Sequence, residues 1–403
     1  MPDDMTREIM SEEIISDNRP LYQTTMPPLI SWVVPVFNTE NLLVETLDSI
    51  AAENGPGIEI IIVDDGSTDG SSARIAAWIA SCKVPTLHIR QENAGLSAAR
   101  MMGVKYATGE FIGFCDSDDF VEISCYTNMA SLAKREKCDV AICRSVVFDS
   151  VSQIVHDFYD TAIWNEILHG RSCVVTSARR EPRIFRFEPN ANTRLLRRSF
   201  LLEKRLAFPL GLHFEDFPVH VEALAAAGRV LLVDSTGYYY RVNRPGKITD
   251  QKSEKRFDIL KSVELGFSAM KRYHVDAAGR AYIAIMATRM TYWCGKHTLN
   301  KDRKRFFIAA CEQIGSLIDP VAANYCMANG IDRREAILVS AFRAKAARFL
   351  IAYSSGRKTA RLWIFKLLFS WKHGRKLRRT LIRAGLRRIR NGTGRFVFMR
   401  NTA

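Results

Sequence analysis

The strongest constraint on the fold is an alternation between two hydrophobic periods from Ser31 to Phe148. Short continuous apolar runs, rich in β-branched residues, alternate with segments whose apolar residues recur at helical spacing. We predict strands at 31–37, 58–66, 86–91, 110–115 and 139–148, and helices at 41–54, 71–82, 95–109 and 124–137. Such a pattern indicates an α/β fold with a mainly parallel sheet and helices on both faces. We also expect Gly109 to end its helix in the left-handed conformation.

Length and composition limit the number of domains and the class of protein that this chain can form. The 403 residues suffice for two domains, and 47% hydrophobic with 25% charged residues is ordinary for a globular protein, which excludes fibrous and broadly disordered classes. No apolar run reaches the roughly 18 to 20 residues that span a bilayer. The N-terminal segment 1–28 is acidic at its start and lacks the apolar core of a secretory signal, so we expect a frayed tail there.

The nine cysteines are scattered singly and form no Cys-x-x-Cys pair. This spacing argues against a zinc site and against a thioredoxin-like redox motif. We therefore expect reduced, buried thiols in a cytosolic protein. The eight histidines also lack metal-ligand spacing, so we expect structural histidines.

Polar residues follow the predicted strands at their carboxyl ends. Asn38 follows the first strand, Asp64 and Asp65 the second, and a cluster of carboxylates at 116–119 the fourth. Ligands of parallel α/β sheets bind at this edge. Three carboxylates within four positions repel one another unless a cation offsets them. Neither a Gly-x-Gly-x-x-Gly motif nor a P-loop occurs, and a carboxylate-held divalent cation is the other common way to neutralise a diphosphate.

Four segments together resemble the family 2 glycosyltransferases with the GT-A fold, which are inverting enzymes that use nucleotide sugars. In order along the chain they are SWVVPVFNTENLLVETLDSI, IEIIIVDDGSTDGS, ENAGLSAARMMGVKYATGEFIGFCDSDDFV and HFEDFPVHVEAL. The resemblance covers about residues 30 to 245. It does not extend to the C-terminal third.

The resemblance implies a donor site. Pro35, Val36 and Phe37 match the segment that lines the nucleoside pocket of the family. Glu40 and the pair Asp64 and Asp65 match positions that contact the base and ribose, with Asp64 favoured within the pair. Arg100 matches an arginine whose guanidinium faces the nucleotide.

The resemblance also implies a metal site and a base. Asp116 and Asp118 match the Asp-x-Asp motif, with Asp118 as the direct ligand of Mg²⁺ or Mn²⁺ and Asp116 supporting the metal or the sugar and ribose hydroxyls. Asp216 matches the general base, and Glu215 is next in line. A divalent cation would stabilise charge on the leaving diphosphate, while the base takes the proton of the incoming hydroxyl. The run from Tyr238 to Arg241, which includes Tyr239, fits strand packing with a solvent-exposed arginine and an acceptor site equally well.

We predict four regions: an acidic tail at 1–28, a GT-A domain at 29–250, a helical domain at 251–355 and a basic amphipathic tail at 356–403. From Ala336 onward the chain carries 18 Lys and Arg and no Asp or Glu. Within it, 361–390 combines aromatic, aliphatic and basic residues, as in a helix at an anionic membrane surface. A solvated tail and a nucleic-acid arm remain alternatives, and no nucleic-acid partner is expected.

These features predict an inverting, metal-dependent glycosyltransferase at the inner face of the cytoplasmic membrane. It would move a sugar from a nucleotide donor, most often a UDP-sugar in this family, to a lipid-linked or glycan acceptor in cell-surface polysaccharide synthesis. A nucleotidyltransferase on a similar sheet is the alternative, although PVFNTE lacks the glycine-rich basic loop it needs. A non-catalytic binding module would not require both the metal carboxylates and the base.

Overall fold

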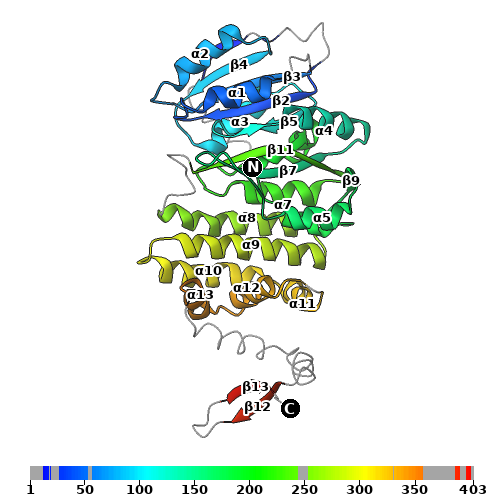
Figure 1. Cartoon of the computed structure of the whole chain (residues 1–403), viewed down its shortest axis with the longest axis vertical. Helices are drawn as coiled ribbons and strands as arrows, with labels where there is room; N and C mark the ends of the chain where they lie inside the picture. The colour runs from blue at the N-terminus through cyan, green and yellow to red at the C-terminus, as the bar shows by residue number, and fades with distance from the viewer. Residues whose placement is uncertain are drawn as a thin grey trace. The chain divides into compact units, whose positions relative to one another are not determined.

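The structure, a computed structural model, describes residues 12–17, 19, 27–52, 57–243, 253–329 and 331–356, and the backbone of 386–390 and 396–400. The chain divides into two compact units, Met1–Ala287 and Thr288–Ala403. Figure 1 labels most of their helices and strands. The division falls inside helix α9 (Ala277–His297).

A mixed sheet forms the centre of the first unit. Its strands run in the order β1-β4-β3-β2-β5-β10-β7-β11-β6, with β8 paired to β7 and β9 to β11. Strands β4, β3, β2 and β5 are parallel, as are β7 and β11, and the other pairs are antiparallel. The strands are β1 (Glu12–Asp17), β2 (Ile30–Val36), β3 (Ile58–Asp64), β4 (Thr86–Gln91), β5 (Phe111–Phe114), β6 (Phe120–Val121), β7 (Val140–Asp149), β8 (Val155–Asp157), β9 (Cys173–Thr176), β10 (Arg194–Arg197) and β11 (Val230–Val242).

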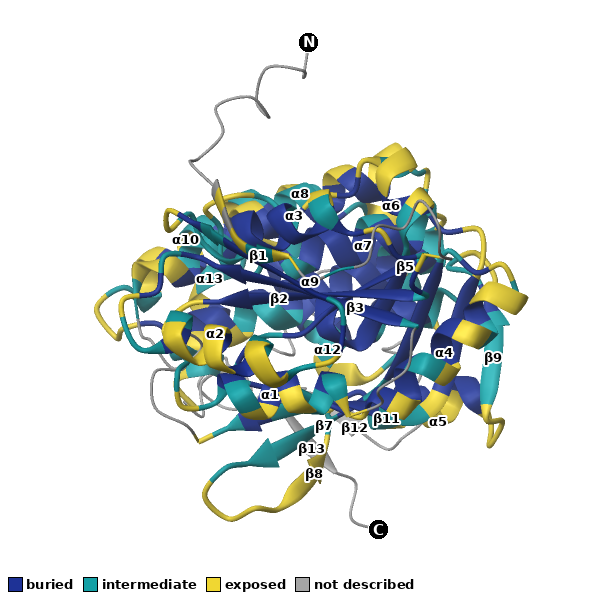
Figure 2. Cartoon of the chain, turned by 90° about the horizontal axis from the view of Figure 1, so that it is seen from above, coloured by how far each residue is buried: buried dark blue, intermediate teal, exposed yellow. Residues whose placement is uncertain are grey.

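Helices cover both faces of the parallel part, with α1 and α2 on one face and α3 on the other (Figure 2). Strand β2 shows why both faces are apolar: Trp32 and Val34 belong to the core cluster beside α1, whereas Val33 meets α3. A Cβ at Gly103 would lie 2.2 Å from Val33 Cγ1, so glycine permits this close approach. The helices of this unit are α1 (Leu43–Ala51), α2 (Ser71–Ser81), α3 (Leu96–Tyr106), α4 (Ile123–Arg135), α5 (Thr161–Leu168), α6 (Arg198–Lys204), α7 (Asp216–Ala226) and α8 (Asp258–Arg272).

The predicted alternation of strands and helices is confirmed, but the expectation for Gly109 is wrong. Helix α3 ends at Tyr106, and Gly109 does not adopt a left-handed conformation. A Cβ at this position would lie 2.7 Å from the backbone nitrogen of Ser31. Glycine is needed here for the close approach of two backbone segments, which no local pattern reveals.

Part of the predicted N-terminal tail is instead a strand. Strand β1 pairs antiparallel with β4, with Glu12 opposite Gln91 and Asp17 opposite Leu87. An uncovered β4 would present unpaired backbone groups at the edge of the sheet, and β1 satisfies them. Just beyond β1, the Arg19 guanidinium donates to the Tyr106 carbonyl (2.9 Å) and to the buried Glu59 carboxylate (3.3 Å).

The second unit is helical as far as residue 356, with the remainder of α9 followed by α10 (Arg303–Leu317), α11 (Pro320–Ala328), α12 (Arg333–Arg343) and α13 (Ala347–Ser354). Within the described ranges, no single helix has the length and apolar composition to cross a bilayer; α10 and α11, bent by 95° at their junction, meet that criterion only as a pair. All nine cysteines are free thiols, buried or half-buried, as expected.

Of the interfacial helix expected at 361–390, the structure describes only residues 386–390. Strand β12 (Leu386–Arg390) pairs antiparallel with β13 (Phe396–Arg400), so the last five residues of that segment are extended and not helical. Residues 361–385 lie outside the described residues.

Candidate active site

The carboxyl ends of β2, β3 and β5 lie side by side. Val36 is opposite Asp64, and Val33 is opposite Phe114, the last residue of β5. The Asp65 backbone N–H donates to the Val36 carbonyl (2.8 Å), which ties the first two loops together. The polar residues that follow these strands therefore meet at one edge of the sheet.

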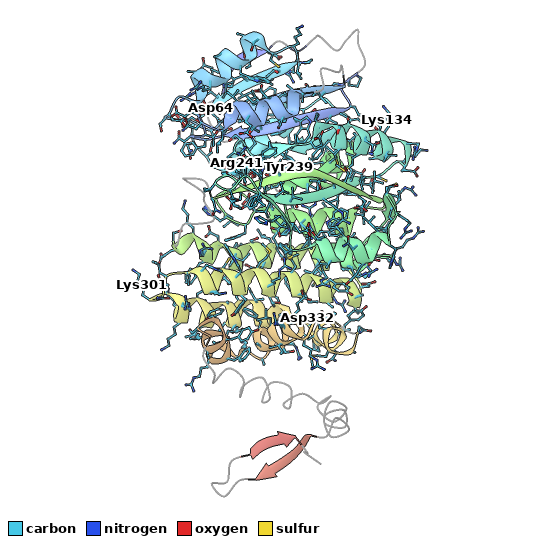
Figure 3. The ribbon with its side chains drawn as sticks, in the orientation of Figure 1. Asp64, Lys134, Tyr239, Arg241, Lys301 and Asp332 are labelled. Atoms are coloured by element: carbon cyan, nitrogen blue, oxygen red, sulfur yellow. The ribbon has the colours of Figure 1, made fainter. Side chains whose placement is uncertain are left out.

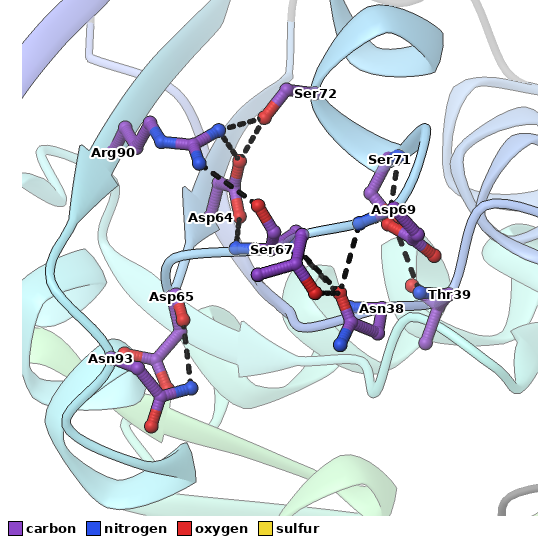
Figure 4. A network of polar contacts seen from close by, with 11 residues as sticks. Asn38, Thr39, Asp64, Asp65, Ser67, Asp69, Ser71, Ser72, Arg90 and Asn93 are labelled. Atoms are coloured by element: carbon purple, nitrogen blue, oxygen red, sulfur yellow. Dashed lines mark hydrogen bonds and ion pairs between the residues drawn. The ribbon is translucent and has the colours of Figure 1, made fainter.

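Asn38 holds the loops after β2 and β3 together (Figure 4). It has a left-handed φ of 54°, and its side-chain oxygen accepts from the backbone N–H groups of Thr68 (2.8 Å) and Asp69 (3.3 Å). The Glu40 carboxylate accepts from the Gly70 N–H (2.7 Å). Pro35 and Val36 are buried within β2, whereas the Phe37 ring is 48% exposed. Among these residues, Phe37 offers a free apolar face to a ligand.

Asp64 and Asp65 anchor the loops around them. The Asp64 side chain is 0% exposed, and it accepts from the Ser67 N–H (2.8 Å), the Ser72 hydroxyl and Arg90 (2.9 Å), as Figure 4 shows. In this structure the Asp64 carboxylate bonds only within the protein, and its contact with the donor stays a prediction. The Asp65 carboxylate is also buried, and it accepts from Gln91 (2.7 Å) and from the N–H groups of Ala94 (2.8 Å) and Gly95 (2.9 Å).

Arg100 lies at the centre of a buried ionic cluster. Its Nη1 donates to Glu215 and Asp216, both at 2.8 Å, and its Nη2 donates to Asp116 at 2.9 Å. The residue is 1% exposed, with its guanidinium 5.0 Å from the centre of the Phe208 ring. In this structure the guanidinium contacts carboxylates of the protein, and its orientation toward a nucleotide stays a prediction. Burial alone would lower the pKa of Arg100, but the three carboxylates raise it above its ordinary value.

The same cluster perturbs the two acids that begin α7. Burial raises the pKa of Asp216 from 3.8 to about 7, with Glu215 and Asp116 adding to the rise and Arg100 opposing it. Burial also raises the pKa of Glu215. The preceding residue, Phe214, has a left-handed φ of 63°, which for a bulky side chain stores on the order of 1 to 3 kcal/mol of strain. The strained turn aims two adjacent acids at one arginine.

A second buried cation, which the sequence did not reveal, lies behind Asp216. Arg194 and His220 line the same small internal cavity as Asp216, together with apolar residues such as Phe114 and Phe208. Arg194 Nη2 donates to His220 Nδ1 (2.7 Å), so His220 carries its proton on Nε2, which donates to the Phe185 carbonyl (3.2 Å). Burial lowers the pKa of Arg194 to about 10 and holds the pKa of His220 well below its ordinary value.

The carboxylates at 116–119 have different surroundings. Asp116 is clamped on both oxygens, because Asn192 Nδ2 donates to Oδ2 (3.0 Å) while Arg100 holds Oδ1. Asp119 is buried and accepts from the Tyr238 hydroxyl and from the Arg241 N–H (2.6 Å). Asp118 lies between them and is partly exposed. Asn192 is a further site residue that sequence reasoning missed, because nothing near it in the chain resembles a motif.

The donor set fits a divalent cation that is shared with a ligand. Within the described residues, no group of three or more His, Cys, Asp or Glu side chains could hold a metal by itself. Mg²⁺ commonly takes one or two carboxylates and completes its shell with phosphate oxygens and water. The partly exposed Asp118 can supply such an oxygen, and the clamped Asp116 presents its remaining lone pairs beside it.

Tyr239 and Arg241 lie on β11 near this loop (Figure 3). The Tyr239 ring stacks on Phe120, with 4.7 Å between ring centres and 12° between planes. Arg241 is buried, and its Nε donates to the Asp118 carbonyl (2.9 Å). The solvent-exposed arginine of the first predicted alternative is therefore wrong, and a contribution of Tyr239 and Arg241 to an acceptor site stays a prediction.

Comparison with known proteins gives one family. The model described as "Glycosyl transferase family 2" matches residues 31–190. EpsJ of Bacillus subtilis, named an uncharacterized glycosyltransferase, is 32% identical over 56% of this chain and 64% of its own length. The glycosyltransferase GlyG of Streptococcus pneumoniae is 31% identical over 55% of this chain and 73% of its own length. The matched part thus spans somewhat less than two thirds of EpsJ.

A solved structure has the same fold. The crystal structure of residues 1–349 of TarS from Staphylococcus aureus in complex with UDP-GlcNAc matches with a TM-score of 0.65, covering 82% of this chain and 93% of that one. The two sequences are 18% identical. At this identity the match shows the GT-A fold and extends it into the helical region beyond the residues that carry the sequence motifs.

Proposed function

This chain belongs to glycosyltransferase family 2, and from that premise we propose that it is an inverting, metal-dependent glycosyltransferase. It transfers a sugar from a nucleotide donor to an acceptor hydroxyl. The observation that carries the proposal is the Arg100 cluster. One guanidinium joins Asp116 to Asp216, with N–O distances of 2.9 and 2.8 Å respectively. Asp116 belongs to the carboxylate loop, residues 116–119 after β5, and Asp216 is at the start of α7.

The two carboxylates act on opposite sides of the reaction in a single displacement. Asp216 acts on the acceptor, and Asp116 supports the cation that binds the leaving diphosphate. Asp216 takes the proton of the acceptor hydroxyl, whose oxygen forms a bond to the anomeric carbon as the bond from that carbon to the diphosphate oxygen breaks. Attack from the side opposite the leaving group inverts the configuration. When bound, the divalent cation stabilises the negative charge that develops on the diphosphate. A base whose pKa is about 7 accepts a proton readily near neutral pH.

We propose a UDP-sugar as the donor and Phe37 as the stacking surface for its base. Phe37 presents an exposed ring at the end of β2, and aromatic side chains stack on bases irrespective of sequence. Asp118 supplies the cation ligand, supported by Asp116. The structure of TarS, which shares the fold, contains UDP-GlcNAc, and this supports a uridine donor here.

The acceptor and location are proposals of the same kind. We propose a lipid-linked or glycan acceptor in cell-surface polysaccharide synthesis; TarS is named a poly(ribitol-phosphate) β-N-acetylglucosaminyltransferase, which also modifies a polymer. We further propose peripheral attachment to the inner face of the cytoplasmic membrane through the basic C-terminal segment. The proposal for the membrane rests on the 18 Lys and Arg after Ala336, and most of that segment lies outside the described residues.

A panel of nucleotide sugars, each with and without Mn²⁺, tests the proposal. We expect release of a nucleoside diphosphate from one donor, dependent on the metal and lost on substitution D216N in the presence of acceptor. NMR of the product gives the anomeric configuration, which must be opposite to that of the donor. Release of pyrophosphate from a nucleoside triphosphate and a sugar phosphate would indicate a nucleotidyltransferase. Donor binding without any turnover would indicate a binding module.

A further inference from the structure

Arg241 is a buried arginine at the carboxyl end of β11. It is 5% exposed, and it has no counterpart among the motif residues that match the family. Burying a guanidinium is unfavourable unless its charge and its N–H groups find partners. The positions of those partners therefore indicate what the residue holds in place.

Two of its hydrogen bonds go to the carboxylate loop. Arg241 Nε donates to the backbone carbonyl of Asp118 (2.9 Å), and the Arg241 backbone N–H donates to Asp119 Oδ1 (2.6 Å). The second oxygen of Asp119 accepts from the Tyr238 hydroxyl. Strand β11 is therefore hydrogen-bonded to both the main chain and a side chain of the segment that carries Asp118.

Aromatic rings and a carboxylate hold the guanidinium itself. Its central carbon lies 5.1 Å from the centre of the Phe120 ring and 5.5 Å from that of Phe148. Its Nη2 lies 2.9 Å from Glu45 of helix α1. The neighbouring Thr46 hydroxyl donates to the Asp119 carbonyl (2.6 Å), so α1 holds the loop from the other side. A planar guanidinium can stack and bond along its edge at once, which a lysine ammonium cannot.

We infer that Arg241 is a positioning residue that fixes the Asp118 carboxylate for the divalent cation of the donor complex. The inference rests on the proposed function, in which Asp118 is a cation ligand. Groups that orient a metal ligand without touching the metal typically change metal affinity by about 10- to 100-fold when they are removed. We expect an effect of that size from Arg241, with little effect on metal-free nucleotide binding.

Arg197, on the central strand β10 of the same sheet, provides a matched control where β5 begins. Its Nε donates to the Cys138 carbonyl (3.0 Å), its Nη1 donates to Glu110 (2.6 Å), and it lies 4.8 Å over the Phe111 ring. These are the same three kinds of contact that Arg241 makes. Arg197 pairs with the first residue of β5, however, whereas the carboxylate loop follows the last. Its loss should affect stability without affecting the metal site.

The experiment compares Arg241→Lys with Arg197→Lys in the full chain. Calorimetry measures UDP affinity at a series of Mn²⁺ concentrations and without metal, and thermal unfolding measures the stability of each variant. We expect Arg241→Lys to weaken Mn²⁺-dependent UDP binding by about 10- to 100-fold and Arg197→Lys to change it less than twofold. Phe148→Leu, which removes one ring beside the guanidinium, should give a smaller weakening, and it replaces Arg241→Lys if that variant does not fold.

The outcomes separate the inference from the function on which it rests. Equal Mn²⁺-dependent affinities in the Arg241→Lys and Arg197→Lys variants would overturn the role of Arg241, as would weakening that is equally large without metal. Asp118→Asn is the reference, because it removes the charged ligand itself. If Asp118→Asn leaves the metal dependence unchanged, the metal assignment fails. If Asp118→Asn abolishes it and Arg241→Lys does not alter it, only the inference about Arg241 fails.

Discussion

Substitution of Asp216 by asparagine should separate the catalytic and structural consequences of the Arg100 cluster. Three carboxylates, Asp116, Glu215 and Asp216, share one guanidinium, so the cluster carries excess negative charge in a buried place. Asparagine has nearly the same shape, and its amide oxygen can still accept from Arg100 Nη1. The substitution therefore removes one charge and the proton acceptor but keeps the hydrogen bond.

The magnitude follows from the pKa of Asp216, which burial raises from 3.8 to about 7. The folded state holds this proton more tightly than the unfolded state, so the stabilising contribution is fully present below about pH 4 and is lost as pH rises through about 7. Each pH unit in that interval corresponds to about 1.4 kcal/mol. Between pH 5 and pH 8 the wild-type protein should lose about 2 to 3 kcal/mol that the D216N variant retains. Activity should change in the opposite sense, with transfer reduced by about 10²-fold or more and donor binding nearly unchanged.

Urea denaturation of both proteins at pH 5, 6, 7 and 8 measures the stability term, and transfer assays with separate determination of kcat and KM measure the catalytic one. The kcat/KM of the wild type should rise with pH through about 7 as Asp216 loses its proton. Glu264→Gln, on the partly exposed surface of α8, is a control in which the pH dependence of stability should stay as in the wild type. Identical pH slopes in the wild type and D216N would refute the buried-proton argument. Full transfer activity in D216N would move the base elsewhere, first to Glu215.

Three further predictions concern the nucleotide, the N-terminal strand and the tail. Phe37→Ala should weaken UDP binding by about tenfold, as expected for a lost stacking contact, and leave the melting temperature unchanged because the ring is exposed; calorimetry and thermal unfolding check both. Arg19→Met should destabilise the first unit by about 1 to 3 kcal/mol in urea denaturation, because it leaves the buried Glu59 carboxylate without its cation, and by less in a Glu59→Gln background. Truncation after Ser355 should abolish sedimentation with anionic vesicles while UDP binding persists. High salt should weaken the attachment of the full chain only in part, since the apolar side chains of the tail are not screened; binding to duplex nucleic acid instead would contradict the membrane proposal.

Local patterns predicted the elements of the first half of the chain well. The run at 58–66 is a strand because its β-branched residues suit a sheet that is covered on both faces, and β3 is covered in this way. Each predicted helix in this region is present, within a few residues at its ends. A hydrophobic pattern that repeats every two or 3.6 residues involves only residues that are close together in the chain. It can therefore be recognised from the sequence.

Features that depend on distant contacts could not be predicted in the same way. Strand β1 is acidic and short, and it forms because β4 offers an unpaired edge. Gly109 looked like a helix end, but its role is the close approach to Ser31 on another strand. Asn192 and Arg194 lie in a segment without any motif, and only the pairing of β10 with β5 and β7 brings them to Asp116 and Asp216.

The arginines show why residue type alone does not determine a role. Arg100 belongs to a motif and was expected to face a nucleotide, yet its buried guanidinium links the carboxylate loop to the acids of α7. Arg241 belongs to no motif, yet its hydrogen bond to the Asp118 carbonyl connects it to the position where a cation is proposed to bind. In both cases the charge is satisfied inside the protein, and we predict that each arginine acts on a ligand through the groups that it holds. A substitution at either position should therefore be read first through Asp116, Asp118 and Asp216, whose geometry it changes, and only then through the substrates.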